Sequence, residues 1–121
     1  MRSFKDKEGR EWTISLPLGA AFRVQDETNV NLLNPGELSD AAKLVVDDLF
    51  LGNVVAALIS DQLRAREIDK KAFLDAMDGG ATRRAATAFL DEYALFFSER
   101  GNDPAREFVE ELQKASIGAT S

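Results

Sequence analysis

Apolar residues recur every three or four positions through residues 81–98, which is the spacing of one stripe along an α-helix. The stripe consists of Ala85, Ala86, Phe89, Leu90, Tyr93, Phe96 and Phe97. Four of these side chains are aromatic and gain most from leaving water, so we expect this helix to form a main wall of the core. Leu95 points away from the stripe, and we expect it either to meet another element or to stay exposed for a partner.

A strand pattern precedes the helices. Trp12, Ile14 and Leu16 alternate with polar residues, which places them on one face of a β-strand. An earlier short run begins at Ser3, and Gly9 between the two runs suits the positive φ of a tight turn. We therefore predict a β-hairpin whose apolar face packs on the helices, because an isolated hairpin is at best marginally stable in water.

Capping residues and helix breakers divide the rest of the chain into helices. Pro17 suits the first turn of a helix that we expect to bury Phe22 and Val24. Asn29 tolerates the left-handed conformation that ends this helix, and Ser39 is the predicted N-cap of the next one. The predicted helices span about residues 17–28, 39–46, 48–67 and 81–98, with a short helix from residue 69 to the glycines at 79–80 and a last helix over residues 104–116.

The later helix boundaries rest on particular residue types. Asp47 and Asp69 are predicted N-caps. Gly79-Gly80 is predicted to end the helix that Asp69 begins. Gly101-Asn102 is predicted to end the aromatic helix, and Asp103-Pro104 then provides an N-cap followed by proline at the first helical position.

These elements predict an α+β fold that is mostly helical, with an N-terminal β-hairpin followed by five or six short packed helices. A chain of 121 residues is long enough to bury one core without disulfides. We predict a single domain over residues 1–121, with the hairpin at 3–16, the helical body at 17–116 and a frayed tail at 117–121.

The sequence offers little catalytic chemistry. It contains no cysteine and no histidine, which removes thiol catalysis, the usual general base and the commonest metal ligands. Adjacent carboxylates occur at Asp47-Asp48, Asp91-Glu92 and Glu110-Glu111, but neighbours on a helix point about 100° apart, and we interpret these residues as caps and solvated faces. Asp6–Gly9 departs from a calcium loop because the residues after it break the ligand register. We predict no enzyme activity and no catalytic, cofactor or metal site.

Charge and hydropathy narrow the possible partners. A net charge of -6 argues against a nucleic-acid partner, whose phosphates require clustered lysine and arginine. The most apolar tract, residues 41–59, is interrupted by Lys43, Asp47 and Asp48, so we expect a buried helical region and no membrane anchor. These observations favour another protein as the binding partner.

The order of features resembles the small tail assembly chaperones of long-tailed bacteriophages and their prophages. The resemblance covers roughly residues 4–97, and the segment after Ser98 has no counterpart in it. The residues that carry it are Phe4–Asp6, Gly9–Ile14, Arg23–Val24, Thr28–Leu33, Asp69, Phe73, Ala76–Gly79, Ala85–Ala86, Ala88–Phe89, Glu92 and Phe96–Phe97. Asn29 stands where the family pattern leads us to expect glycine, a change that keeps the backbone role.

The resemblance implies a non-catalytic chaperone in the bacterial host cytoplasm that coats the helical tape measure protein and helps recruit the major tail tube protein. Self-association is a further possibility. Such chaperones are absent from the finished virion. The alternative is a structural virion component, a tail or head–tail connector protein, and mass spectrometry of purified particles separates the two.

The partner-binding hypothesis centres on the last helix. Phe108, Val109 and Leu112 share one apolar face of that helix, outside the region of resemblance. The helix either covers Leu95 on its own domain or moves away, so that its face and Leu95 together receive helical segments of the tape measure protein.

Overall fold

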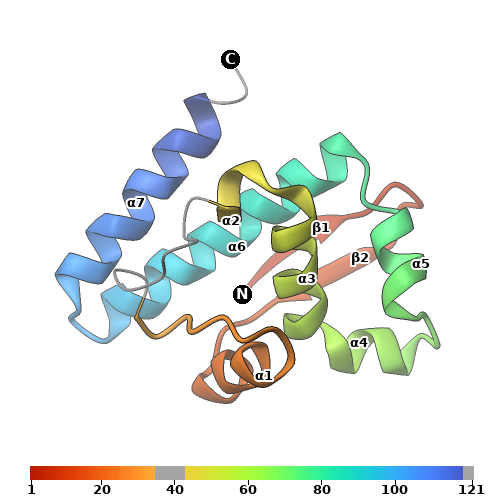
Figure 1. Ribbon diagram of the computed structural model, residues 1–121, viewed down its shortest axis with the longest axis horizontal. Coiled ribbons are helices and arrows are strands. Elements are labelled where there is room, and N and C mark those ends of the chain that lie inside the picture. The colour runs from red at the N-terminus through yellow and green to blue at the C-terminus, as the bar shows by residue number, and fades with distance from the viewer. Residues whose placement is uncertain (35–42, 119–121) are drawn as a thin grey trace.

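The computed structural model describes the backbone of residues 1–34 and 43–118, and the side chains of these residues as far as 115 (Figure 1). The predicted cap at Ser39 and the last three residues of the predicted tail lie outside the described residues. In the described part the fold is α+β and mostly helical, as predicted: an antiparallel hairpin precedes a series of helices. The elements are β1 (Arg2–Lys5), β2 (Glu11–Ile14), α1 (Leu18–Thr28), α2 (Lys43–Val46), α3 (Asp48–Leu58), α4 (Ser60–Ala65), α5 (Lys70–Asp75), α6 (Gly79–Glu99) and α7 (Asp103–Gly118).

Helix α6 runs through the middle of the molecule and contacts β1, α3 and α7 (Figure 1). All seven residues of the predicted stripe are buried on it, which confirms the stripe as a wall of the core. Tyr93 shows how the aromatic residues are used: its ring stacks on Phe89 with centroids 5.2 Å apart, and its hydroxyl donates to the Leu32 carbonyl at 2.6 Å. The hydroxyl therefore keeps a partner although burial raises the pKa of Tyr93.

The hairpin packs on the helices through the predicted face. Trp12, Ile14 and Leu16 are all buried, and the Trp12 ring meets the edge of Phe73 on α5 with centroids 5.5 Å apart. Gly9 has a φ of 81° in the turn, as predicted for this position. The register places Phe4 opposite Trp12, so both strands contribute to one apolar face.

The predicted helix 48–67 is wrong as a single element, because it divides into α3 and α4 at Ile59. The break redirects the chain so that Gln62 reaches β2. Its side-chain amide accepts from the Thr13 N–H at 2.9 Å and donates to the Thr13 carbonyl at 2.8 Å. These two long-range hydrogen bonds are not visible in local helix propensity. Asp47 caps α3 as predicted, accepting from the Phe50 N–H at 3.0 Å.

Three further boundaries differ from the prediction. Gly79-Gly80 begins α6 instead of ending α5, since the Asp78 carboxylate accepts from the Ala81 N–H at 2.8 Å and caps the new helix. At α7 the cap is Asn102, one residue earlier than predicted, and its side chain accepts from the Ala105 N–H at 3.3 Å. The α7 helix continues to Gly118, so residues 117–118 are helical where fraying was predicted. Asp69 caps α5 as predicted.

Candidate functional site

The residues of the partner-binding hypothesis occupy different environments in the α6–α7 pair. Val109 is fully buried and Leu112 nearly so, and both belong to the same core as the aromatic stripe. Phe108 is partly buried against that core. Leu95 keeps 42% of its surface exposed. A partner can therefore reach Leu95 directly, but it reaches Val109 and Leu112 only if α7 leaves the body.

A hydrogen bond joins α7 to α6, and further contacts close the C-terminal end of α6. The Gln113 amide donates to Asp91 on α6 at 2.8 Å. Where the chain turns between the helices, the Arg100 guanidinium lies 3.7 Å from the Phe96 ring centroid and donates to the Phe96 carbonyl at 3.0 Å. The Asn102 N–H donates to the Phe97 carbonyl at 3.0 Å. Moving α7 away would break the hydrogen bond between Gln113 and Asp91 and would expose Val109, so the docked arrangement is the reference state for any binding event.

A second apolar surface lies on α1 and was missed at the sequence level. The prediction that Phe22 is buried is wrong, because 70% of its surface is exposed; Leu18, one turn earlier, is 57% exposed. Helix α1 turns its small residues Ala20 and Ala21, together with Val24, into the core. We call Leu18 and Phe22 the α1 apolar pair; they share one face of a regular helix.

Another pair of exposed apolar residues occurs where α2 meets α3. Val46 is 71% exposed and Leu49 is 63% exposed. The Asp47 cap lies between them, so they do not belong to one continuous helix. Their exposure closely matches that of Phe22 and Leu18, which makes them a suitable control surface.

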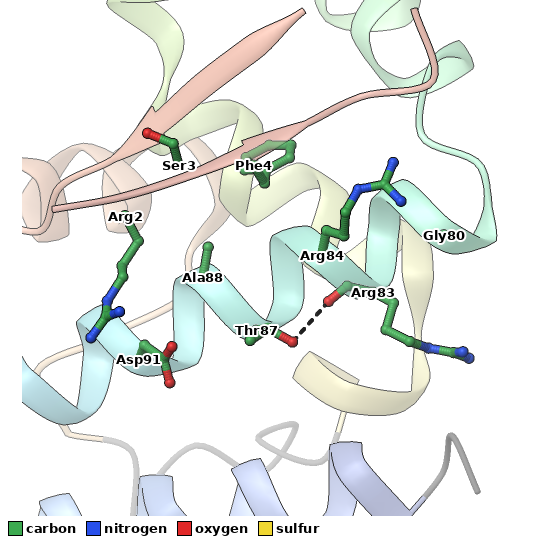
Figure 2. A pocket seen from close by; sticks show the side chains of 9 residues that line it. All are labelled: Arg2, Ser3, Phe4, Gly80, Arg83, Arg84, Thr87, Ala88 and Asp91. Carbon is green, nitrogen blue, oxygen red and sulfur yellow. Dashed lines mark hydrogen bonds between the residues drawn. The ribbon is translucent and has the colours of Figure 1, made fainter. Parts of the chain in front are cut away.

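A groove of about 550 Å³ opens between β1 and α6 (Figure 2). Its lining residues are Arg2, Ser3, Phe4, Gly80, Arg83, Arg84, Thr87, Ala88 and Asp91. Figure 2 shows Arg2 reaching from β1 toward α6, while Arg83 and Arg84 project from α6 itself. We call this the β1–α6 groove. Its lining contains three arginines and one aspartate, so the groove is locally basic although the net charge of the chain is -6.

The Asp6 carboxylate, in the loop that faintly resembles a calcium site, is buried and serves the hairpin turn. One oxygen accepts from the Glu8 and Arg10 N–H groups at 2.9 and 3.0 Å. The other accepts from the Arg10 side chain at 2.8 Å and from the Trp12 indole at 2.9 Å. Burial by itself raises the pKa of Asp6, but the hydrogen bonds from Trp12 and Arg10 outweigh it and hold the pKa below its ordinary value.

The pKa of Asp6 predicts a contribution to acid denaturation. A folded pKa below the unfolded value of about 3.9 means that this carboxylate stabilises the fold above that pH and loses its contribution as the pH falls through the folded pKa. We expect urea unfolding between pH 6 and pH 2 to show a shallower loss of stability in Asp6→Asn than in the parent, with Asp26→Asn, an exposed site, behaving like the parent. Parallel pH profiles for parent and Asp6→Asn would contradict this role.

Glu92 departs from the expectation of a solvated carboxylate. Its side chain is buried on α6 and forms an ion pair with the Met1 amino group. The two groups are not hydrogen-bonded to each other. Its neighbour Asp91 is half-buried and holds Gln113. The two carboxylates thus have separate structural partners, and nothing in their geometry joins them as an acid–base pair.

Within the described ranges, no three acidic side chains come together in a way that would hold a metal ion. In the same part of the chain, every helix is too short or too polar to cross a bilayer. Comparisons with family models, with curated proteins and with solved structures find no match to this chain.

Proposed function

We propose that this protein is a non-catalytic tail assembly chaperone of a long-tailed phage or prophage, and that it binds helical segments of the tape measure protein. The observation that carries the proposal is the α1 apolar pair. An amphipathic helix docks through apolar anchors one turn apart, and Leu18 and Phe22 present such a spacing on an exposed helix face. The order of features along residues 4–97 supports the same class of protein.

The size of the pair fits reversible binding. Fully burying a leucine or phenylalanine side chain contributes about 1.5–3 kcal/mol, and aromatic residues are typical anchors of interfaces. Two such side chains give weak binding for each chaperone molecule. A long helical partner then carries many copies, and tube subunits can displace each copy without a large energetic barrier. As the resemblance implies, we propose that the protein acts in the host cytoplasm and leaves before the virion is complete.

A non-catalytic role fits the structural use of four carboxylates. Asp47, Asp69 and Asp78 each cap a helix, and Asp6 organises the hairpin turn. Because each of these four carboxylates already accepts structural hydrogen bonds, none of them is available for proton transfer. The chain also lacks the histidine and cysteine side chains that most nucleophilic or general-base mechanisms use.

The proposal includes a second surface, the α6–α7 face, which consists of Leu95, Phe108, Val109 and Leu112. Leu95 is accessible at once, whereas Phe108, Val109 and Leu112 become available only after α7 is displaced. Displacement costs the docking free energy of α7, so a first contact through the α1 apolar pair has the lower free-energy cost. Contact with the major tail tube protein or self-association would follow once the tape measure is coated.

Co-expression with the tape measure protein tests the proposal. We expect the parent chaperone to keep the tape measure soluble, and Leu18→Asp with Phe22→Asp to lose this effect because two charges replace the apolar anchors. Val46→Asp with Leu49→Asp is the matched control, since it makes the same chemical change at similarly exposed sites. Circular dichroism checks that each variant folds.

Three outcomes of this experiment contradict the account at different levels. If the parent leaves the tape measure insoluble, the chaperone assignment falls. If the Val46 and Leu49 variant loses activity while the Leu18 and Phe22 variant keeps it, the α1 apolar pair is not the site. If only Leu95→Asp abolishes the effect, binding occurs through the α6–α7 face.

A further inference from the structure

We propose that the β1–α6 groove binds an extended acidic segment of a partner protein, which adds as a third strand to the outer edge of β1. This inference is independent of the proposed chaperone function. It rests on three features of the groove: an open strand edge, unpaired guanidinium groups and a cavity large enough for a short stretch of chain.

The open edge follows from the hydrogen bonds of β2. Both backbone groups of Thr13 are bound by the Gln62 side chain, so they point away from β1. Ser3 lies opposite Thr13 in the antiparallel register. In such a ladder, directly opposed residues either bond to each other or both point outward. The Ser3 N–H and carbonyl therefore face the outer edge of β1.

The two outer edges of the hairpin differ in how side chains hydrogen-bond to them. Gln62 closes the edge of β2 at Thr13, while Arg84 closes part of the edge of β1 by donating to the Lys5 carbonyl at 3.2 and 3.1 Å. Among the described residues, neither backbone group of Ser3 has a protein partner outside the β1–β2 ladder. An exposed strand edge with a free donor and a free acceptor is the template for strand addition.

The charge of the groove selects an acidic segment. In the described part of the chain, the side chains of Arg2 and Arg83 form no ion pair or hydrogen bond, and Arg84 is bonded only to a neutral carbonyl. The one acidic lining residue, Asp91, accepts from Gln113. Carboxylates on the incoming strand would form charge-assisted hydrogen bonds with these guanidinium groups (Figure 2).

The backbone requirement favours a peptide over a nucleic acid. The sugar–phosphate backbone of DNA can meet the arginines, but it offers no donor for the Ser3 carbonyl at strand spacing. A peptide supplies an N–H and a carbonyl together. A second hollow of about 500 Å³ toward the hairpin turn shares Ser3, Phe4 and Arg84 with the groove of about 550 Å³, so the two hollows adjoin along β1.

A labelled peptide of alternating glutamate and valine is the probe, measured by fluorescence anisotropy with the full chain. We expect saturable binding that weakens with salt and falls about tenfold or more in Arg2→Glu with Arg83→Glu, because each charge-assisted hydrogen bond contributes strongly to affinity. Lys70→Glu with Lys114→Glu is the matched control at exposed sites outside the groove. The proposal is overturned if the acidic peptide does not bind, or if a lysine–valine peptide or a single-stranded oligonucleotide binds as tightly.

Ser3 distinguishes strand addition from simple charge attraction. Ser3→Pro removes the outward N–H without removing a ladder hydrogen bond and should weaken peptide binding, whereas Ser3→Ala keeps the N–H and should bind like the parent. Hydrogen exchange on the parent protein provides a readout that needs no variant: we expect slower exchange of the Ser3 amide when the peptide is bound. Bound peptide with an unchanged Ser3 exchange rate would overturn the strand-addition mode.

Discussion

Trp12→Ala is expected to lower the free energy of unfolding by about 3–5 kcal/mol, the usual cost of deleting a buried large aromatic side chain. The Trp12 ring is fully buried, meets Phe73 edge-on, and lies 4.4 Å from the Arg66 guanidinium. The substitution also removes the indole donor to Asp6. Cavity formation and the lost hydrogen bond act in the same direction.

Urea unfolding followed by far-ultraviolet circular dichroism measures this loss without relying on tryptophan fluorescence. Trp12→Phe is the matched variant: it keeps most of the ring's packing, and the loss of the donor to Asp6 alone should cost about 1–3 kcal/mol. A loss below about 1 kcal/mol in Trp12→Ala would mean that the hairpin contributes little to the core.

Val109→Asp is expected to release α7 from the body. Val109 has no exposed surface, and an uncompensated buried charge costs about 3–5 kcal/mol. The Gln113–Asp91 hydrogen bond alone does not replace this buried contact, so we expect the variant to unfold at lower urea and to be cleaved within α7 by limited proteolysis.

Leu95→Asp is the control for this experiment, because its side chain is already 42% exposed and the charge can remain in water. Its unfolding midpoint should stay close to that of the parent. If Val109→Asp and Leu95→Asp behave alike, α7 is not docked through its buried face. Val109 and Leu112 would then be accessible to a partner without displacement of α7.

Local sequence patterns correctly predicted the elements that have one distinctly apolar face. The aromatic stripe of α6 and the alternation around Trp12 each define one buried side, and the structure buries both. Asp47 and Asp69 were also predictable as caps, since capping depends on the cap and the next three residues. These features need no knowledge of distant neighbours.

The remaining features depend on tertiary contacts. Phe22 is exposed because α1 can approach the core through its alanines, a choice that apolar spacing alone does not decide. The break at Ile59 accompanies the pairing of Gln62 with Thr13, which are 49 positions apart and therefore outside any local pattern. The β1–α6 groove needs the register of the hairpin and the placement of α6, so its arginines look like ordinary surface charge in the sequence.

Photo-crosslinking tests the central claim most directly. A photo-reactive amino acid replaces Phe22 in one variant, Val46 in a second and Leu95 in a third, and each is co-expressed with the tape measure protein. Phe22 and Val46 are 70% and 71% exposed, so simple accessibility does not distinguish them. The account predicts strong crosslinks to the tape measure from position 22 and few from position 46. Equal crosslinking from both positions, or none from position 22, would contradict it.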